Sequence, residues 1–216
     1  DFEVSQRPDI LVANSKNVQE RIKKFYRRES VVIYPPINTL SFPRKSFDPE
    51  VLRTEGRESI LYRSRIKSGM TNGYFLTVGR LVRGKGVDII VEACIKLGLS
   101  LKVVGTGSEL ENLQKIQKPF NRIQGKQVRD GIQFLDAVSD EELARLYAGA
   151  KATLLASEDE DFGIVPVESM AAGTPVIAPA TGGYLETVVN GETGILYGES
   201  GQVTMESLIE GIKRFN

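Results

Sequence analysis

The chain has 216 residues, of which 41% are hydrophobic and 26% are charged, a composition typical of a globular protein. Its 28 Lys and Arg residues balance its 28 Asp and Glu residues, so it lacks the basic excess that most nucleic-acid-binding proteins carry. It has no histidine, which excludes a Ser-His-Asp triad or a His-ligated metal centre within this chain.

The single cysteine and the ends of the chain give further expectations. Cys94 lies in an apolar helical pattern and is expected to be a small buried side chain in a reducing compartment. No apolar run approaches the ~20 residues that a membrane span needs, and no signal peptide is recognisable. The chain begins at Asp1 in a charged segment, so we expect it to be a fragment of a longer polypeptide.

Residues 1–38 predict two short strands and one helix. An apolar run at 9–13 predicts a buried strand, Ser15 can cap a helix over 16–27, and a second strand at 30–34 ends at two prolines. These elements are too few for a stable domain, so they must pack on another part of the protein. Residues 39–73 are charged and weakly periodic, and are expected to form a linker or insertion with a helix near 48–53 or 57–67.

From residue 74 the chain alternates between short apolar strands and amphipathic helices. The strands are expected at 74–78, 100–104, 132–135, 151–155 and 174–178, and the helices at 86–97, 107–117, 139–148, 163–172 and 204–215. This alternation predicts an α/β fold over 74–200, a doubly wound parallel sheet with helices on both faces, followed by a C-terminal helix in 201–216. Such sheets bind ligands at the carboxyl ends of their strands.

A loop rich in glycine and cations follows the first of these strands. Residues 79–86, GRLVRGKG, nearly match the P-loop of nucleoside triphosphatases, but Gly86 replaces the Ser or Thr that binds Mg²⁺, which argues against an ATPase. Arg80 and Lys85 are then available to a pair of phosphates, helped by the start of the next helix. The alternative is a surface turn with two solvated cations.

Two other turns carry paired glycines. Gly105 and Gly107 lie between a strand and a helix, but the third glycine of a dinucleotide-binding fingerprint is absent. They indicate either the close approach of a ligand or a plain turn. Gly182 and Gly183 follow the strand at 174–178 and leave the same two interpretations open.

The most specific segment is an acidic loop that runs into a helix, residues 157–168, SEDEDFGIVPVE. Gly163 opens the helix, so the amides of residues 163–165 are free to bind a phosphate. A solvated acidic loop is one alternative, and a metal site built from the adjacent carboxylates is another, although four neighbouring acids on a loop are unspecific.

The helix that follows this loop carries a second glutamate. Ile164, Val167 and Ala171 are expected to face the core, which places Glu168 beside that apolar stripe. A carboxylate buried there needs hydrogen-bond donors, which ribose hydroxyls would supply. The alternative is a capped or paired carboxylate at the boundary of the core.

Taken together, these segments resemble the C-terminal, donor-binding domain of retaining nucleotide-sugar glycosyltransferases with the two-domain GT-B fold, whose domains are Rossmann-like. The resemblance rests on five motifs in order: Gly79-Arg80-Leu81…Lys85-Gly86, Gly105-Thr106-Gly107, Phe134-Leu135, Glu160…Glu168 around Phe162-Gly163, and Gly182-Gly183-Tyr184-Leu185-Glu186. It covers residues 74–200, and residues 1–38 look like a remnant of the family's N-terminal acceptor domain. The segment 160–168 looks most like the mannosyltransferases that use GDP-mannose.

The resemblance implies the site residues. Three charged side chains would be catalytic: Glu160 would contact sugar hydroxyls near the anomeric carbon, while Arg80 and Lys85 would hold the diphosphate and stabilise the leaving group. The implied substrate-binding positions are Gly79, Gly105, Gly107, Phe134, Phe162, Gly163, Ile164, Val165 and Glu168. Among them, Glu168 would hold the ribose and Phe134 would border the base. No metal and no cofactor are implied.

The resemblance also implies partners and a reaction. The partners would be a UDP- or GDP-linked sugar, the missing N-terminal domain and an unknown acceptor sugar or lipid-linked sugar. The reaction would be transfer of a hexose with retention. Because the acceptor domain is missing, this chain is expected to bind donor weakly and to turn over little. A cytoplasmic location is implied, with the missing domain as the part that could reach the inner face of the membrane.

Two departures and three alternatives remain. Asp136 stands where the family often has glycine, which would alter the base pocket, and most of the N-terminal domain is absent. An epimerase or phosphorylase of the same fold is one alternative. A non-catalytic nucleotide-binding or interaction domain is the second, and the ATPase disfavoured by Gly86 is the third.

Overall fold

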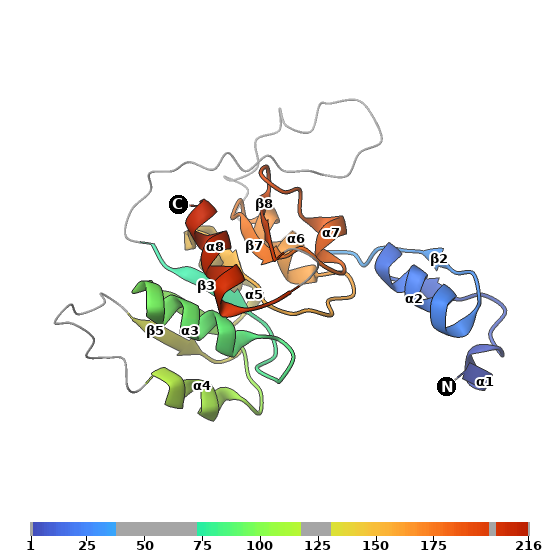
Figure 1. Ribbon diagram of the computed structural model, residues 1–216, viewed down its shortest axis with the longest axis horizontal. Coiled ribbons are helices and arrows are strands. Elements are labelled where there is room, and N and C mark those ends of the chain that lie inside the picture. The colour runs from blue at the N-terminus through green and yellow to red at the C-terminus, as the bar shows by residue number, and fades with distance from the viewer. Residues whose placement is uncertain (1, 38–72, 118–130, 199–201, 216) are drawn as a thin grey trace.

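A computed structural model describes residues 2–37, 73–117, 131–198 and 202–215, and Figure 1 shows their arrangement. The linker expected at 39–73 and its helix at 48–53 or 57–67 therefore lie outside the described residues, apart from Gly73. The described strands form two sheets, a two-stranded sheet near the N-terminus and a six-stranded sheet in the rest of the chain.

The N-terminal unit, residues 2–37, contains helix α1 (Phe2–Ser5), strand β1 (Val12–Ala13), helix α2 (Lys16–Tyr26) and strand β2 (Val31–Val32). The two strands are parallel, and α2 begins where Ser15 accepts a hydrogen bond from the amide of Val18. Figure 1 shows this unit at the right, on the side of the large sheet that carries α7. The expected strands and helix are present, with strands shorter than the apolar runs that predicted them. The prediction that the run at 9–13 is buried is wrong for most of it, because Ile10 and Val12 are 70% and 56% exposed.

The large sheet holds six parallel strands. They are β3 (Phe75–Val78), β4 (Leu101–Val104), β5 (Ile132–Leu135), β6 (Thr153–Leu154), β7 (Val176–Pro179) and β8 (Gly194–Tyr197). Their order is β5-β4-β3-β6-β7-β8, so the chain starts in the middle, winds to one edge, and then crosses over to build the other half. The order reverses between β3 and β6, which pair at Leu76 and Thr153. The expected doubly wound parallel α/β fold is confirmed.

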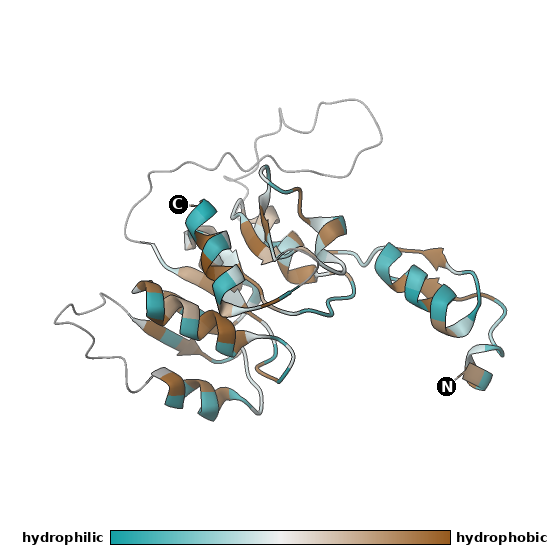
Figure 2. Cartoon of the chain, viewed as in Figure 1, coloured by the Kyte–Doolittle hydropathy of each residue, from teal (hydrophilic) through white to brown (hydrophobic). Residues whose placement is uncertain are grey.

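Helices cover both faces of this sheet. They are α3 (Val87–Leu97), α4 (Leu110–Gln117), α5 (Asp140–Gly149), α6 (Ile164–Ala171), the short α7 (Tyr184–Thr187) and α8 (Met205–Phe215). Helices α3, α4 and α8 pack on one face, and α5 and α6 on the other. Figure 2 shows α2, α4 and α8 banded in teal and brown, as expected for helices with one polar and one apolar side.

The core lies mainly between β3, β4 and the α3 face. Phe75, Leu101, Val91 and Cys94 are buried there at 1% exposure or less. The expectation that Cys94 is a small buried side chain is confirmed, and burial raises the pKa of its thiol to about 12. Among the described residues, no helix combines the length and apolar character that crossing a membrane requires.

Three elements were not expected from the sequence: α1, α7 and β8. The core-facing stripe of α6 was predicted only in part: Val167 and Ala171 pack partly buried against the core, whereas Ile164 is 45% exposed. The fully buried residues of this helix are Pro166, Ser169 and Met170. The apolar residues of α6 surround most of the helix, so their spacing does not fix its orientation. Ser169 can face the core because its hydroxyl is paired with Thr153 and donates to the carbonyl of Thr174.

Candidate functional site

An open cleft of about 380 Å³ lies where the strand order of the large sheet reverses. It is lined by residues 77–80, at the end of β3, and by residues 155–157, which follow β6. A crevice at this position is the usual ligand site of doubly wound sheets. Of the twelve residues that the sequence proposed for the site, eight line the cleft: Gly79, Arg80, Lys85, Glu160, Phe162, Gly163, Ile164 and Val165.

The loop after β3 brings both predicted cations to the cleft. It is tied to the neighbouring turn by three backbone hydrogen bonds: Gly79 donates to Val104, Leu81 donates to Thr106, and Glu109 donates to Leu81. Arg80 is exposed and forms no ion pair with any other described residue. This loop thus presents one unpaired guanidinium and one ammonium to the cleft.

Gly105 and Gly107 do not line the cleft. They pack against the loop after β3: a Cβ atom on Gly105 would overlap the carbonyl oxygen of Gly79, and one on Gly107 would overlap that of Leu81. Glycine is therefore needed at these two positions because two loops of the protein approach each other closely there. They support the shape of the loop after β3, residues 79–86, which we call the cation loop. Any contact of Gly105 or Gly107 with a ligand stays a prediction.

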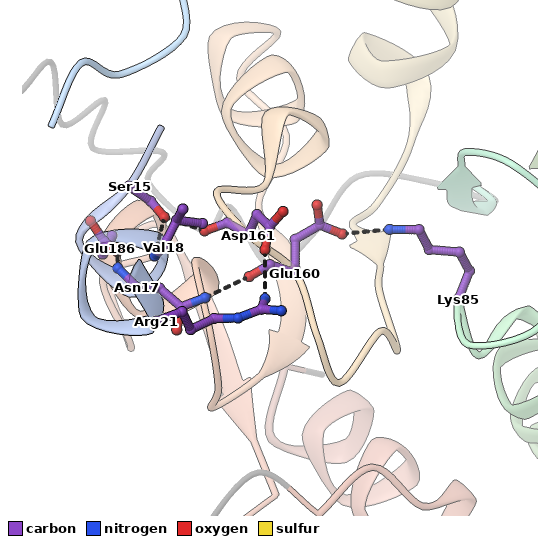
Figure 3. A network of polar contacts seen from close by, with 8 residues as sticks. All are labelled: Ser15, Asn17, Val18, Arg21, Lys85, Glu160, Asp161 and Glu186. Atoms are coloured by element: carbon purple, nitrogen blue, oxygen red, sulfur yellow. Dashed lines mark hydrogen bonds and ion pairs between the residues drawn. The ribbon is translucent and has the colours of Figure 1, made fainter. Parts of the chain in front are cut away.

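The acidic loop after β6 places Glu160 opposite the cation loop. Oε2 of Glu160 lies 2.9 Å from Nζ of Lys85, and the two side chains are 24% and 30% exposed. The carbonyl of Glu160 accepts a 2.8 Å hydrogen bond from the amide of Gly183, so the turn after β7 holds the backbone of the acidic loop at this residue. Figure 3 shows the carboxylate pointing away from its own loop toward Lys85.

Helix α6 begins at the floor of the cleft. Gly163, with a φ of 87°, precedes it and provides no side-chain cap, so the first amides of the helix lack the partners that a Ser or Asp cap would give. Ile164 and Val165, the first two residues of the helix, line the cleft. The partial positive charge of a helix N-terminus favours an anion at this point.

Glu168 lies one turn further along α6 and does not line the cleft. Its carboxylate accepts a 3.0 Å hydrogen bond from the hydroxyl of Tyr147 on α5, which is the paired-carboxylate arrangement that the sequence left open. Burial raises the pKa of Glu168, the hydrogen bond from Tyr147 opposes this rise, and the charge of Asp140 adds to it. Contact with a ribose stays a prediction.

Phe134 is the remaining predicted residue outside the cleft. It lies on β5, opposite Val103 of β4, and packs partly buried against the core. Its strand ends at Leu135, on the same carboxyl edge of the sheet as the cleft. Phe134 is thus one residue from the carboxyl end of β5, and its contact with a base stays a prediction.

Sequence reasoning missed several cleft residues, and two kinds of signal could have found some of them. Thr77 lies in the last two residues of a predicted strand and Ser157 follows another, so the positions of these polar residues marked them. Tyr184 lines the cleft from the turn after β7, is 2% exposed, and has a pKa raised by burial and by the nearby Glu160. Asn14 and Pro35 enter from the N-terminal unit, which no periodicity in the sequence could place beside the large sheet.

The cleft is thus lined by two cations, the start of a helix and two acidic residues, Glu160 and Asp161. Within the described ranges, no group of three or more Cys, Asp or Glu side chains could hold a metal ion. Cations and oriented amides stabilise phosphate groups without a metal, and Arg80 is free to make such contacts. The arrangement is suited to a phosphorylated ligand whose other part reaches Glu160.

The fold and the cleft together define a doubly wound α/β domain whose crevice, at the switch point of the sheet, is lined by both cations and carboxylates. A family model described as "Glycosyl transferases group 1" matches residues 60–215, more than half of the chain, and the chain belongs to this family. The family resemblance noted in the sequence is confirmed at this level.

Individual relatives agree with the family assignment. The chain is 28% identical over 188 residues to an uncharacterised glycosyltransferase of Methanocaldococcus jannaschii, a match that spans 87% of this chain and 45% of that protein. It is 36% identical over 137 residues to a glycogen synthase of Thermus thermophilus, covering 62% of this chain and 30% of the relative. The chain thus spans less than half of the length of these relatives.

Solved structures share the fold at lower identity. Sucrose-phosphate synthase of Thermosynechococcus elongatus has a TM-score of 0.74 at 23% identity, over 99% of this chain and 50% of the other. The Anabaena protein HepE, in complex with UDP and glucose, has a TM-score of 0.71 at 21% identity, over 99% of this chain and 56% of the other. These likenesses show the fold, and the chain spans about half of the length of each of the two proteins.

Proposed function

We propose that this chain is the donor-binding half of a retaining hexosyltransferase and that its cleft binds a nucleotide-diphospho-sugar. Arg80, Lys85 and the amides at the start of α6 would hold the diphosphate, and Glu160 would bind hydroxyls of the sugar. The observation that carries the proposal is the meeting of Lys85 with Glu160 at the switch point of the sheet, beside free helix amides.

The chemistry follows from these charges. Cleavage of the bond between the sugar and the diphosphate leaves negative charge on the leaving phosphate, which two cations and oriented amides would stabilise as it develops. Glu160, on the opposite side of the cleft from Lys85's loop, would orient the sugar through its hydroxyl groups. Glu168 would hold the ribose if it exchanged the hydroxyl of Tyr147 for those of the ligand, and Phe134 would border the base.

The identity of the sugar and the base is part of the proposal. GDP-mannose is the first donor to test, because residues 160–168 resemble the segment of GDP-mannose-dependent mannosyltransferases. UDP-glucose is the second, because HepE has been solved in complex with it. The acceptor would bind between this chain and an N-terminal domain, of which residues 2–37 would be the last part; their exposed apolar side chains, such as Ile10, Val12 and Val31, suit such packing.

The test is a binding panel with UDP, GDP, UDP-glucose and GDP-mannose, followed by ligand-detected NMR because weak binding is expected. Arg80→Ala should weaken binding by about 1.5–3 kcal/mol, the usual contribution of a hydrogen bond to a charged group. Arg83→Ala is the matched control, since Arg83 lies in the same loop but its side chain is 90% exposed and paired with Glu109. Equal effects of both variants, or no binding of any of the four nucleotides, would contradict the proposal.

Catalysis is a separate arm of the proposal. We expect this chain alone to bind donor and to turn over little, because transfer requires a second cleft wall and an acceptor site. Donor hydrolysis or transfer by this chain at the rate of a complete hexosyltransferase would overturn that part. Binding without any turnover, even after the rest of the parent protein is supplied, would favour the non-catalytic nucleotide-binding alternative.

A further inference from the structure

Glu186, the last residue of the Gly-Gly turn motif, holds the start of helix α2. Its Oε2 accepts a 2.9 Å hydrogen bond from the backbone amide of Lys16, and its Oε1 accepts one of 2.7 Å from that of Asn17. The hydroxyl of Tyr34 donates to Oε2 at 3.1 Å. One carboxylate on α7 thus satisfies two of the amides that no carbonyl within α2 can reach, at the positive end of that helix.

The same end of α2 contacts the acidic loop of the cleft. The hydroxyl of Ser15 accepts a hydrogen bond from the amide of Val18 at 3.0 Å and donates one to the carbonyl of Asp161 at 2.6 Å. Arg21 pairs with the carboxylate of Asp161 at 2.8 Å. Figure 3 shows these contacts on one side of the loop and Lys85 on the other. Two parts of the chain about 145 positions apart therefore meet at the residue next to Glu160.

The backbone of Glu160 is held directly as well. Its carbonyl accepts from the amide of Gly183 at 2.8 Å and from the side-chain amide of Asn17 at 3.4 Å. The carbonyl thus lies between the Gly-Gly turn and α2, while the side chain extends toward Lys85. Because the backbone of a residue sets the origin of its side chain, a shift of α2 would move the Glu160 carboxylate relative to the cation loop.

We propose that Glu186 is a positioning residue of the donor site: by holding the start of α2 against the acidic loop, it fixes the backbone at Glu160 and Asp161 and so the place of the Glu160 carboxylate. The inference rests on the proposed function, since it takes Glu160 as the group that binds the sugar. On this proposal, helix α2 of the N-terminal unit helps to hold the donor site in place. Glu186, the final glutamate of the turn motif, then acts by positioning Glu160 and not by contacting the ligand.

The test combines one measurement without ligand and one with it. Glu186→Gln keeps the shape of the side chain but removes its charge and one of its two acceptors. Glu192→Gln is the matched control, because Glu192 is exposed, close in sequence, and undergoes the same change of charge. Hydrogen exchange followed by mass spectrometry reports on residues 14–18 and 158–165, and ligand-detected NMR compares UDP-glucose with UDP and GDP-mannose with GDP.

The expected result is specific to the sugar. Glu186→Gln should accelerate hydrogen exchange in both segments. It should also lower the affinity for UDP-glucose or GDP-mannose, whichever the chain binds, by about fivefold, the change that loss of one helix cap of roughly 1 kcal/mol produces. The matching nucleoside diphosphate should change by less than about twofold, because Arg80, Lys85 and the α6 amides are untouched. A purely structural role would weaken both ligands alike.

Two outcomes overturn the inference. Unchanged exchange in 158–165 would show that α2 does not hold the acidic loop, and equal weakening of sugar nucleotide and nucleoside diphosphate would show that Glu186 does not act through Glu160. Should Glu186→Gln fail to fold, Ser15→Ala removes the hydrogen bond to Asp161 without changing charge, and the same pattern is expected of it. If the unmodified chain binds none of the four nucleotides, the proposed function fails. If it binds them, and Glu186→Gln and Ser15→Ala both have the affinities of Glu192→Gln, only the role of Glu186 fails.

Discussion

The ammonium of Lys85 lies 2.9 Å from Oε2 of Glu160, although 75 positions separate the two residues in the chain. They meet because β3 and β6 are neighbours in the sheet and each is followed by a loop at the same edge. With side chains 30% and 24% exposed, the pair is only partly screened by water. An anion that enters the cleft therefore meets both an attracting and a repelling charge.

The first prediction separates these two charges. Glu160→Gln removes the repulsion, so UDP or GDP should bind unchanged or up to about fivefold more tightly, in line with the roughly 1 kcal/mol of a partly exposed ion pair. The sugar nucleotide should bind about tenfold more weakly, because a carboxylate that accepts from sugar hydroxyls is lost. Calorimetric titration or ligand-detected NMR measures both affinities.

Glu158→Gln is the control for this experiment, since Glu158 is an exposed acid in the same loop and does not line the cleft. It should leave both affinities within about twofold of the unmodified chain. Parallel weakening of nucleoside diphosphate and sugar nucleotide by Glu160→Gln would contradict the assignment of Glu160 to the sugar side of the ligand.

The second prediction concerns the glycines of the cation loop. Gly84 and Gly86 both have positive φ values, 84° and 64°, so alanine at either position carries the same conformational cost of about 1–2 kcal/mol. A Cβ atom at Gly84 has open space around it, whereas one at Gly86 would overlap the backbone of Ala156. Gly86→Ala should therefore destabilise the fold by about 3 kcal/mol or more and Gly84→Ala by half of that or less.

Urea denaturation measures the two stabilities. The difference between the variants is the useful quantity, because it cancels the strain that they share. Equal losses would mean that the loop can move away from Ala156, and the close contact between the β3 and β6 loops would then not matter for stability. The sequence marks Gly86 as a departure from the P-loop and as the end of the motif Gly79-Arg80-Leu81…Lys85-Gly86; the structural reason for a glycine there is this contact.

The third prediction concerns the reactivity of Cys94. Burial raises the pKa of its thiol from 9.0 to about 12, and the thiolate is the reactive form. Iodoacetamide at pH 8 should therefore leave Cys94 unmodified in the folded chain and modify it fully in urea, as mass spectrometry can check. Because the folded pKa is the higher one, the contribution of Cys94 to stability is fully present below about pH 9 and is lost as the pH rises toward 12. Rapid labelling of the folded chain would contradict the buried position.

Much of this fold could be predicted from local pattern, and the remainder depends on contacts between distant segments. The five strands from β3 to β7 were expected because each is a short apolar run followed by a turn, and the cation loop because Gly79 and Lys85 bracket one such turn. The orientation of α6 was predicted only in part, with Ile164 wrongly placed, because apolar residues surround this helix on most sides. The contact of α2 with Glu186 was not predictable, since nothing in the periodicity of residues 16–26 indicates which carboxylate meets the start of that helix.

The fourth prediction is a pH dependence of stability that depends on Glu168. Burial raises the pKa of this carboxyl above its ordinary value, and the hydrogen bond from Tyr147 only partly opposes the rise. A group whose folded-state pKa is raised contributes stability below its unfolded pKa and loses that contribution as the pH rises through the folded value. The ionised form of Glu168 is therefore a cost to the fold, and this cost is greater at pH 7 than at pH 4.

Glu168→Gln keeps an oxygen that can accept from Tyr147 and removes the charge. The Tm of the variant should exceed that of the unmodified chain by more at pH 7 than at pH 4, and thermal denaturation at the two pH values measures this difference. Glu192→Gln, a change of the same charge at an exposed position, should show no such increase. A Tm difference that is the same at both pH values, or larger at pH 4, would mean that the carboxylate of Glu168 is well solvated or better paired than its contact with Tyr147 indicates. If Glu168 also holds a ribose, Glu168→Gln should bind each nucleotide of the panel more weakly although it is more stable, because the carboxylate that accepts from the ribose hydroxyls is lost. Binding of the ligand would then explain why the chain keeps an acidic group that costs stability.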